Sequence, residues 1–289
     1  MYNLRYHVAS LVAAFLFLTV GLLLGTIVAE RGTLDTQRDT LISSLRDQFE
    51  QLSAQNTALS TQNDALGSFV DDVLPLLTAG QLAGDHVVVI SNTGRTDGLS
   101  LVAETITRAG GTPVVITAHG PQLGLADSEA SQVATAYVDV SPADETAFIG
   151  EVTARLAEEW SSGGDRPLTD ALVSVGALTV DGEFPVGEPI AGVVTLASWE
   201  GVPDEAALGV ARALALMGMP AAGVEMSTQA TGVAASAAGN GLSAVEDVGT
   251  PQSDFALVYV LAGRASGYFG VSDDANARYP VVEAEVQQP

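Results

Sequence analysis

The loop after the first apolar strand carries the residues best suited to binding chemistry. Residues 91–98 read SNTGRTDG and lead into a helical pattern. Glycines, hydroxyls and Arg95 at a helix N-terminus can hold a small anion, because the free N–H groups and the helix dipole favour negative charge. A tight turn in which Asp97 caps the helix explains the same residues more simply, and we prefer that interpretation.

The histidines and paired acids give little indication of a metal site or an acid–base site. His86 begins a strand and His119 follows one, and neither has acidic neighbours at metal-ligand spacing. We therefore place both at strand edges or on the surface. Glu246-Asp247 and Asp273-Asp274 lie in glycine-rich stretches, which is typical of solvated turns rather than of acid–base pairs.

Sequence motifs for common catalytic sites are missing. The chain has no G-x-G-x-x-G motif and no G-x-S-x-G nucleophile elbow, and without lysine it cannot form a P-loop. It also lacks cysteine, which excludes disulfides, thiolate metal sites and cysteine nucleophiles. We predict that residues 80–289 are not an enzyme, require no cofactor and act by presenting a surface.

Charge narrows the choice of partners. The 289 residues carry 35 acids against 11 basic residues, all of them arginine. Residues 80–289 hold 27 of the acids and seven arginines, a net charge of −20. Such a domain repels phosphate backbones, so we predict no nucleic-acid partner.

Short apolar runs alternate with helical patterns after residue 80. We predict strands at residues 86–90, 114–116, 193–196 and 222–226, and helices at residues 97–109, 142–160 and 204–217. Residues 172–175 and 255–261 fit either a helix or a strand, and residues 267–289 look loosely structured. Strand–helix alternation predicts an α/β domain with a mainly parallel sheet.

An uncharged run of 22 residues, Val8–Ala29, stands near the N-terminus. As a helix it would reach roughly 33 Å, enough to cross a hydrocarbon core. A cleaved signal peptide is the alternative, but Ile27-Val28-Ala29 is a poor cleavage site because it has a bulky residue where a small one is preferred. We predict a retained single-pass anchor. Arg5 before the run and two arginines after it are nearly balanced, so charge does not set the orientation.

A heptad repeat follows the apolar run. Leucines seven apart occupy the d positions, namely Leu45, Leu52, Leu59 and Leu66, and Val73 continues them. The a positions are Ile42, Phe49, Asn56, Asn63 and Val70. Leucine at d with asparagine at a favours a parallel dimer of fixed register, so we predict a homodimer through residues 42–73. The alternatives are a coiled coil with another envelope protein, or one amphipathic helix packed on its own domain.

Small residues in the apolar run support the same dimer axis. Gly21 and Gly25 form a small-xxx-small pair, which lets two helices approach closely in lipid. We therefore divide the chain into five segments. These are a tail (1–7), a transmembrane anchor (8–29), a coiled-coil stalk (30–79), an α/β domain (80–266) and a loose tail (267–289).

The whole arrangement resembles the mycobacterial copper transport protein B family, MctB. The resemblance rests on the order of the elements and on short motifs, namely Leu4-Arg5-x-His7, Gly21-x-x-x-Gly25, the heptads, the 86–90 strand, residues 241–248 (GLSAVEDV) and residues 267–270 (GYFG). It implies a cell-membrane protein with its N-terminus inside, its bulk outside the cytoplasm and a role in copper transport and homeostasis.

The copper role can be weighed against the residues. Cu(I) prefers thiolate and thioether ligands, and only Met217, Met219 and Met226 cluster in the sequence. These methionines are the copper-ligand candidates, although ordinary packing also explains them. One span encloses no pore, so transport would require oligomers or a partner. The same architecture fits a scaffold that couples the membrane to the cell wall or to the division machinery through its coiled coil.

Overall fold

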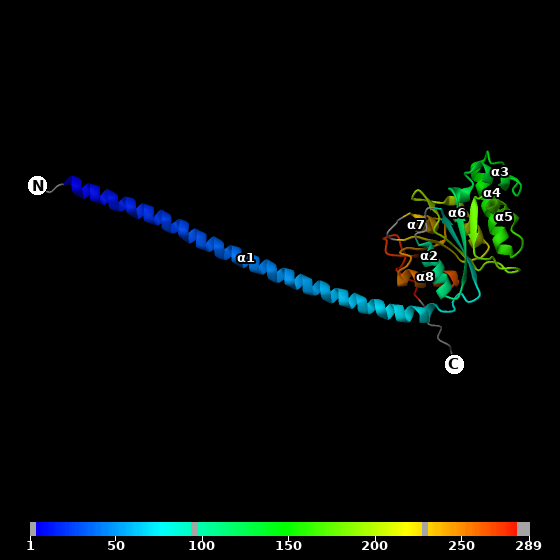
Figure 1. The fold of residues 1–289 in the computed structure, drawn as a ribbon, viewed down its shortest axis with the longest axis horizontal. Helices are drawn as coiled ribbons and strands as arrows, with labels where there is room; N and C mark the ends of the chain where they lie inside the picture. Colours follow the sequence, from blue (N-terminus) through cyan, green and yellow to red (C-terminus); the bar gives the residue numbers. More distant parts are fainter. Residues whose placement is uncertain (1–3, 94–97, 227–230, 282–289) are drawn as a thin grey trace. The chain divides into compact units, whose positions relative to one another are not determined.

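The computed structural model describes residues 4–93, 98–226 and 231–281, without the side chains of residues 4, 5 and 28–40. Its contacts divide the chain into two units, Met1–Ser68 and Phe69–Pro289. The α1 helix, Leu4–Thr78, begins in the first unit and ends in the second. The other elements belong to the second unit (Figure 1).

Helix α1 contains the apolar run. Residues Tyr6–Ile27 have a mean hydropathy of 2.5 and are long and apolar enough to cross a membrane. Two hydroxyls in this segment hydrogen-bond to the helix itself, Thr19 to the carbonyl of Phe15 and Thr26 to that of Leu23. Such internal bonding satisfies a hydroxyl without water, as a lipid environment requires.

The heptad leucines from Leu45 to Leu66 are all more than half exposed in this single chain. Further along, Val70 and Val73 are half-buried and line an apolar groove together with Phe255. The last heptad therefore packs partly on its own domain, as one of the alternatives for this helix expected. Pro75 does not end the helix, which continues for one more turn to Thr78.

The second unit is built on a seven-stranded sheet in the order β3-β2-β1-β4-β7-β8-β9. The strands of this sheet are β1 (His86–Asn92), β2 (Thr112–Ala118), β3 (Leu178–Asp181), β4 (Gly192–Thr195), β7 (Ala221–Val224), β8 (Ser243–Val245) and β9 (Tyr268–Phe269). All neighbours pair in parallel except β3, which is antiparallel to β2. The prediction of a mainly parallel α/β sheet is confirmed.

Helices cover both faces of this sheet. They are α2 (Leu99–Arg108), η1 (Gln122–Gly124), α3 (Ser128–Ala134), α4 (Glu145–Ser162), α5 (Pro167–Ser174), α6 (Glu205–Leu216), α7 (Val233–Gly239) and α8 (Pro251–Leu261). Side chains of α4 to α7 pack on one face and those of α2 and α8 on the other. Strand β1 contributes side chains to the apolar cores on both faces of the sheet. Val88 and Ile90 point to one face, and Val87 and Val89 point to the other.

The structure decides two segments that the sequence left open and corrects the prediction for the C-terminal segment. Of the two segments that fitted either a helix or a strand, residues 172–174 lie in α5 with Val175 as its C-cap, and residues 255–261 lie in α8. The segment from residue 267 is not loose throughout, because Tyr268 and Phe269 form the edge strand β9. Gly98, with a φ of 81°, is the N-cap residue of α2, and the Asp97 that we expected to cap this helix lies outside the described residues.

Candidate functional site

In an open parallel sheet, ligands bind at the carboxyl ends of the strands, where the strand order reverses. Here that point lies between β1 and β4. The loop predicted as an anion site begins there, but Arg95 and Asp97 lie outside the described residues. In the described part of this edge, the small hairpin of β5 (Ser198–Trp199) and β6 (Val202–Pro203) follows β4 directly.

A buried carboxylate, Asp204, closes this edge. Its Oδ1 accepts the N–H groups of Ala206 and Ala207, both at 3.1 Å, and so caps α6. Its Oδ2 accepts the N–H of Leu123 at 3.2 Å and the side-chain N–H of Asn92 at 3.1 Å. Asp204 therefore ties three segments together, and its acceptor positions are used inside the fold.

A second buried carboxylate, Glu246, holds the C-terminal strand. The Tyr268 hydroxyl donates to its Oε1, and the N–H groups of Val271 and Ser272 donate to its Oε2 at 3.0 Å each. A Cβ on Gly270 would overlap that Oε2, so the turn requires glycine. The two C-terminal sequence motifs therefore meet at Glu246, and the expectation of a solvated Glu246-Asp247 turn was wrong for Glu246.

These contacts change the acid–base behaviour of the pair. Burial by itself would raise the pKa of Glu246, but the hydrogen bonds from Tyr268, Ser272 and Val271 outweigh it and lower that pKa. Burial and the bond to Glu246 raise the pKa of Tyr268 to about 12. Both groups thus keep one protonation state across neutral pH, which suits a structural lock better than a proton-transfer pair.

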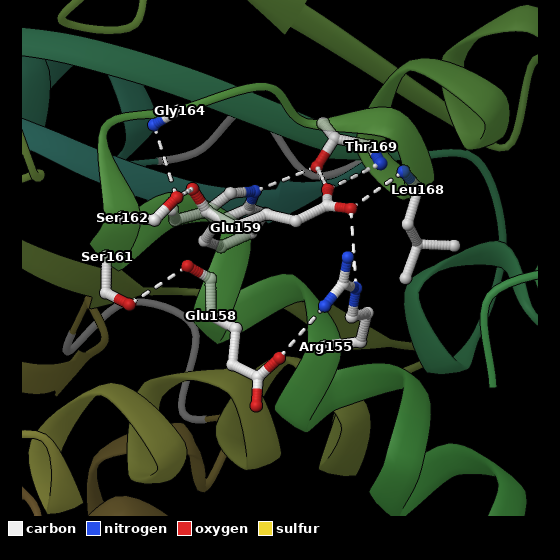
Figure 2. A network of polar contacts seen from close by, with 9 residues as sticks. Arg155, Glu158, Glu159, Ser161, Ser162, Gly164, Leu168 and Thr169 are labelled. Atoms are coloured by element: carbon white, nitrogen blue, oxygen red, sulfur yellow. Dashed lines mark hydrogen bonds and ion pairs between the residues drawn. The ribbon is translucent and has the colours of Figure 1, made fainter. Parts of the chain in front are cut away.

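A third buried carboxylate, Glu159, joins α4 to α5 (Figure 2). Its Oε1 accepts the N–H of Leu168 at 2.8 Å, and its Oε2 accepts both the N–H and the hydroxyl of Thr169 at 3.0 Å. The Trp160 indole N–H also donates to the Thr169 oxygen at 3.0 Å. Glu159 thus supplies from a neighbouring helix the cap that α5 lacks in its own sequence.

The sequence contains a signal for Glu159 that our predictions did not use. Glu159 lies three residues after Leu156 and seven after Val152, so it falls on the apolar face of α4. An acid on such a face must find partners inside the fold. No comparable spacing marks Glu246, because β8 is only three residues long.

The three candidate copper ligands do not converge. Met217 ends α6 and is 46% exposed, while Met219 packs against the core just before β7. Met226 follows β7, and its Cγ and Sδ would lie 3.1 and 3.2 Å from a Cβ added at Gly98. Met219 precedes β7 and Met226 follows it, so the two stand at opposite ends of this strand.

Other metal ligands are not grouped either. Within residues 4–93, 98–226 and 231–281, no three histidine, aspartate or glutamate side chains gather as a metal site would require. His86 lies at the start of β1, as predicted. His119 follows β2, and its Nε2 lies 2.5 Å from the Thr179 hydroxyl oxygen, where it forms a hydrogen bond at the sheet edge.

The predicted association surfaces are exposed in the described part of α1. Gly21 and Gly25 have no atom within 4 Å of an added Cβ, and they form the base of a shallow notch in the helix surface. Asn56 and Asn63 are exposed on the same helix as the heptad leucines. These positions are therefore accessible to a partner helix.

The comparisons with known proteins agree with the motifs. No curated protein matched the sequence. The family model described as "Copper transport outer membrane protein, MctB" matches residues 1–280, nearly the whole chain. The chain therefore belongs to the MctB family.

Proposed function

We propose that this protein is a membrane-anchored envelope protein that helps keep intracellular copper low without catalysing a reaction. The observation that carries the proposal is the family match over residues 1–280, which includes both the apolar helix and the α/β domain. The Tyr6–Ile27 segment supports a retained single-pass anchor. We place the N-terminus inside and the α/β domain outside the cytoplasm, as the family resemblance implies.

The heptads support a parallel homodimer as the working form. A helix whose d-position leucines are all more than half exposed, from Leu45 to Leu66, gains stability by burying them against a second helix. The notch at Gly21 and Gly25 would extend that contact into the membrane. The dimer therefore follows one axis along α1.

Direct copper ligation by a three-methionine site receives no support from the geometry, because Met219 and Met226 lie at opposite ends of β7. We instead assign the copper function to the assembled envelope protein and its partners. The test is copper content in cells that lack the gene, complemented with variants. Wild type should restore low copper.

The triple variant Met217→Leu, Met219→Leu, Met226→Leu should also restore low copper, whereas Leu52→Asp with Leu59→Asp should not. Zinc content serves as the control and should not change. Restoration by the stalk variant together with failure of the methionine variant would overturn this assignment in favour of a methionine copper site. If deletion leaves copper content unchanged, the copper role itself is wrong.

A scaffold that couples the membrane to the cell wall or to the division machinery is the second candidate. The same exposed leucines favour it, because a heptad surface can also pair with a different helix. A photo-crosslinker at Gln55, beside the heptad core, separates the two assemblies. Crosslinking in cells yields a product of twice the chain's mass for the homodimer and a product with a second protein for the scaffold.

A further inference from the structure

A cavity of about 500 Å³ opens beside the first turn of α5, in the second unit. This volume falls in the range of small-molecule sites. Its wall combines three charged side chains, Asp165, Arg166 and Asp170, with an apolar surface. The apolar part consists of Val173, Val180, Phe184 and Val186.

Arg166 is the cation of this wall and is incompletely paired. One Nη donates to the carbonyl of Pro185 at 3.0 Å, and the guanidinium carbon lies 4.3 Å from the centre of the Phe184 ring. Its Nε–H is buried and has no acceptor. Arg166 lines the cavity and forms no ion pair within 4 Å among the described residues. Its guanidinium group can therefore receive a ligand carboxylate in a hydrogen bond between two charged partners.

Two acids stand beside the arginine without neutralising it through a direct contact. Asp165 and Asp170 are exposed, and neither forms an ion pair within 4 Å in the part of the chain that the structure describes. A purely anionic ligand would be repelled by both acids. A ligand that also carries an ammonium group would instead be attracted to them.

The frame around the cavity is fixed by contacts deeper in the fold. Glu159 binds the first turn of α5 through the N–H groups of Leu168 and Thr169 (Figure 2). Across the cavity, the Gly187 N–H donates to the carbonyl of Gly163 at 3.0 Å. The Phe184 ring also packs against Trp160, with 6.1 Å between ring centres. Charged groups held in this way need little reordering when a ligand binds.

We propose that this cavity binds a small zwitterion of the amino-acid class with an aliphatic side chain. The carboxylate pairs with Arg166, and the ammonium group faces Asp165 and Asp170. The side chain lies against Val173 and Val180. This inference goes beyond the copper role and does not depend on it.

The test is calorimetric titration of the full-length protein in detergent with three probes: leucine, N-acetylleucine without the ammonium charge, and leucinamide without the carboxylate. Leucine should bind, and each of the other probes should bind at least about tenfold more weakly, because each loses a charge-assisted hydrogen bond. Equal binding of all three probes, or no binding of leucine at millimolar concentration, would overturn the proposal.

Two variants locate the site. Arg166→Gln should abolish leucine binding, and Asp170→Asn should weaken it without touching the arginine. Arg264→Gln, a change outside the cavity lining, should leave it unchanged. Tryptophan fluorescence melts show whether each variant is folded. If Arg166→Gln unfolds the domain, Asp170→Asn decides: unaltered leucine affinity in that folded variant would refute the assignment.

Discussion

Replacing Glu159 with alanine should destabilise the α/β domain far more than replacing its neighbour Glu158. Glu159 is 3% exposed and accepts two backbone N–H groups and one hydroxyl at the start of α5. In the alanine variant the N–H groups of Leu168 and Thr169 stay buried without acceptors. Each unmet buried donor costs about 1–3 kcal/mol, so we expect a loss of about 2–4 kcal/mol in the free energy of unfolding.

The measurement follows tryptophan fluorescence during thermal unfolding. Both tryptophans, Trp160 and Trp199, lie in the second unit, so the signal reports on the α/β domain and not on the stalk. For a domain of this size, roughly 2–4 °C of Tm accompany each kcal/mol. The Glu159→Ala variant should therefore melt roughly 5–15 °C below the wild type.

Glu158→Ala is the matched control on the same helix. Glu158 is exposed and forms one surface ion pair, with Arg155 at 3.1 Å. Such pairs contribute about 0–1 kcal/mol, so its Tm should change by no more than a few degrees. Equal melting temperatures for the two variants would refute the claim that Glu159 caps α5.

Three further predictions concern the Glu246–Tyr268 pair, the packing of β7 against α7, and the coiled-coil stalk. Because the pKa of Glu246 is lowered in the folded state, its contribution to stability should be lost as pH falls below the ordinary glutamate pKa of about 4.5. Because the pKa of Tyr268 is raised, its contribution should be lost as pH rises from 10 towards about 12. Urea unfolding of the wild type and of Glu246→Gln across this pH range measures both losses. Gly223→Ala should lower the free energy of unfolding by about 1–3 kcal/mol, because the new Cβ would overlap the side chain of Ala237 in α7. Gly239→Ala, at the exposed end of α7, is the control and should cause no measurable loss in the same urea assay. Replacing Asn56 and Asn63 with leucine should raise stalk stability and admit higher oligomers in sedimentation, and a wild-type chain that sediments as a monomer would contradict the dimer.

The parts of the fold that the sequence predicted are those with a strong local signal. The continuous β-branched run at residues 86–90 lies in β1, a strand buried on both faces, and the helical period at residues 204–217 lies in α6 with Asp204 as its cap. Helix α4 was likewise predicted from its apolar spacing. Each of these segments is long enough for its period to be read without knowledge of its neighbours.

The missed elements are short, and their identity depends on what lies beside them. Strands β8 and β9 contain three and two residues, too few to show any period, and they exist because each pairs with the strand before it. Strand β3 alternates buried and exposed residues over only four positions at the sheet edge. Helix α7 is a run of small residues whose helical state depends on close packing against β7 at Gly223.

The candidate cavity was missed for a related reason. Arg166 and Phe184 are separated by a helix and a strand, and only the fold brings the ring under the guanidinium group. Spacing along the chain cannot reveal such a pair. The three methionines show the opposite case, since they cluster in the sequence but β7 separates Met219 from Met226 in the fold.

Most of the buried acids of this domain accept hydrogen bonds from N–H groups. Four acids are buried among the described residues, namely Glu159, Asp204, Glu246 and Asp254. Asp254 pairs with Arg108 at 2.8 Å, and the Oε1 of Glu159 lies 3.8 Å from the Nε of Arg155. The shortest contacts of Glu159, and the contacts of Asp204 and Glu246, are chiefly with N–H groups at helix starts and tight turns. These N–H groups need an acceptor in any case, so one carboxylate satisfies several donors and fixes the joint between two segments. Glu246, which the sequence alone assigned to a solvated turn, is therefore one of the residues that hold the fold together.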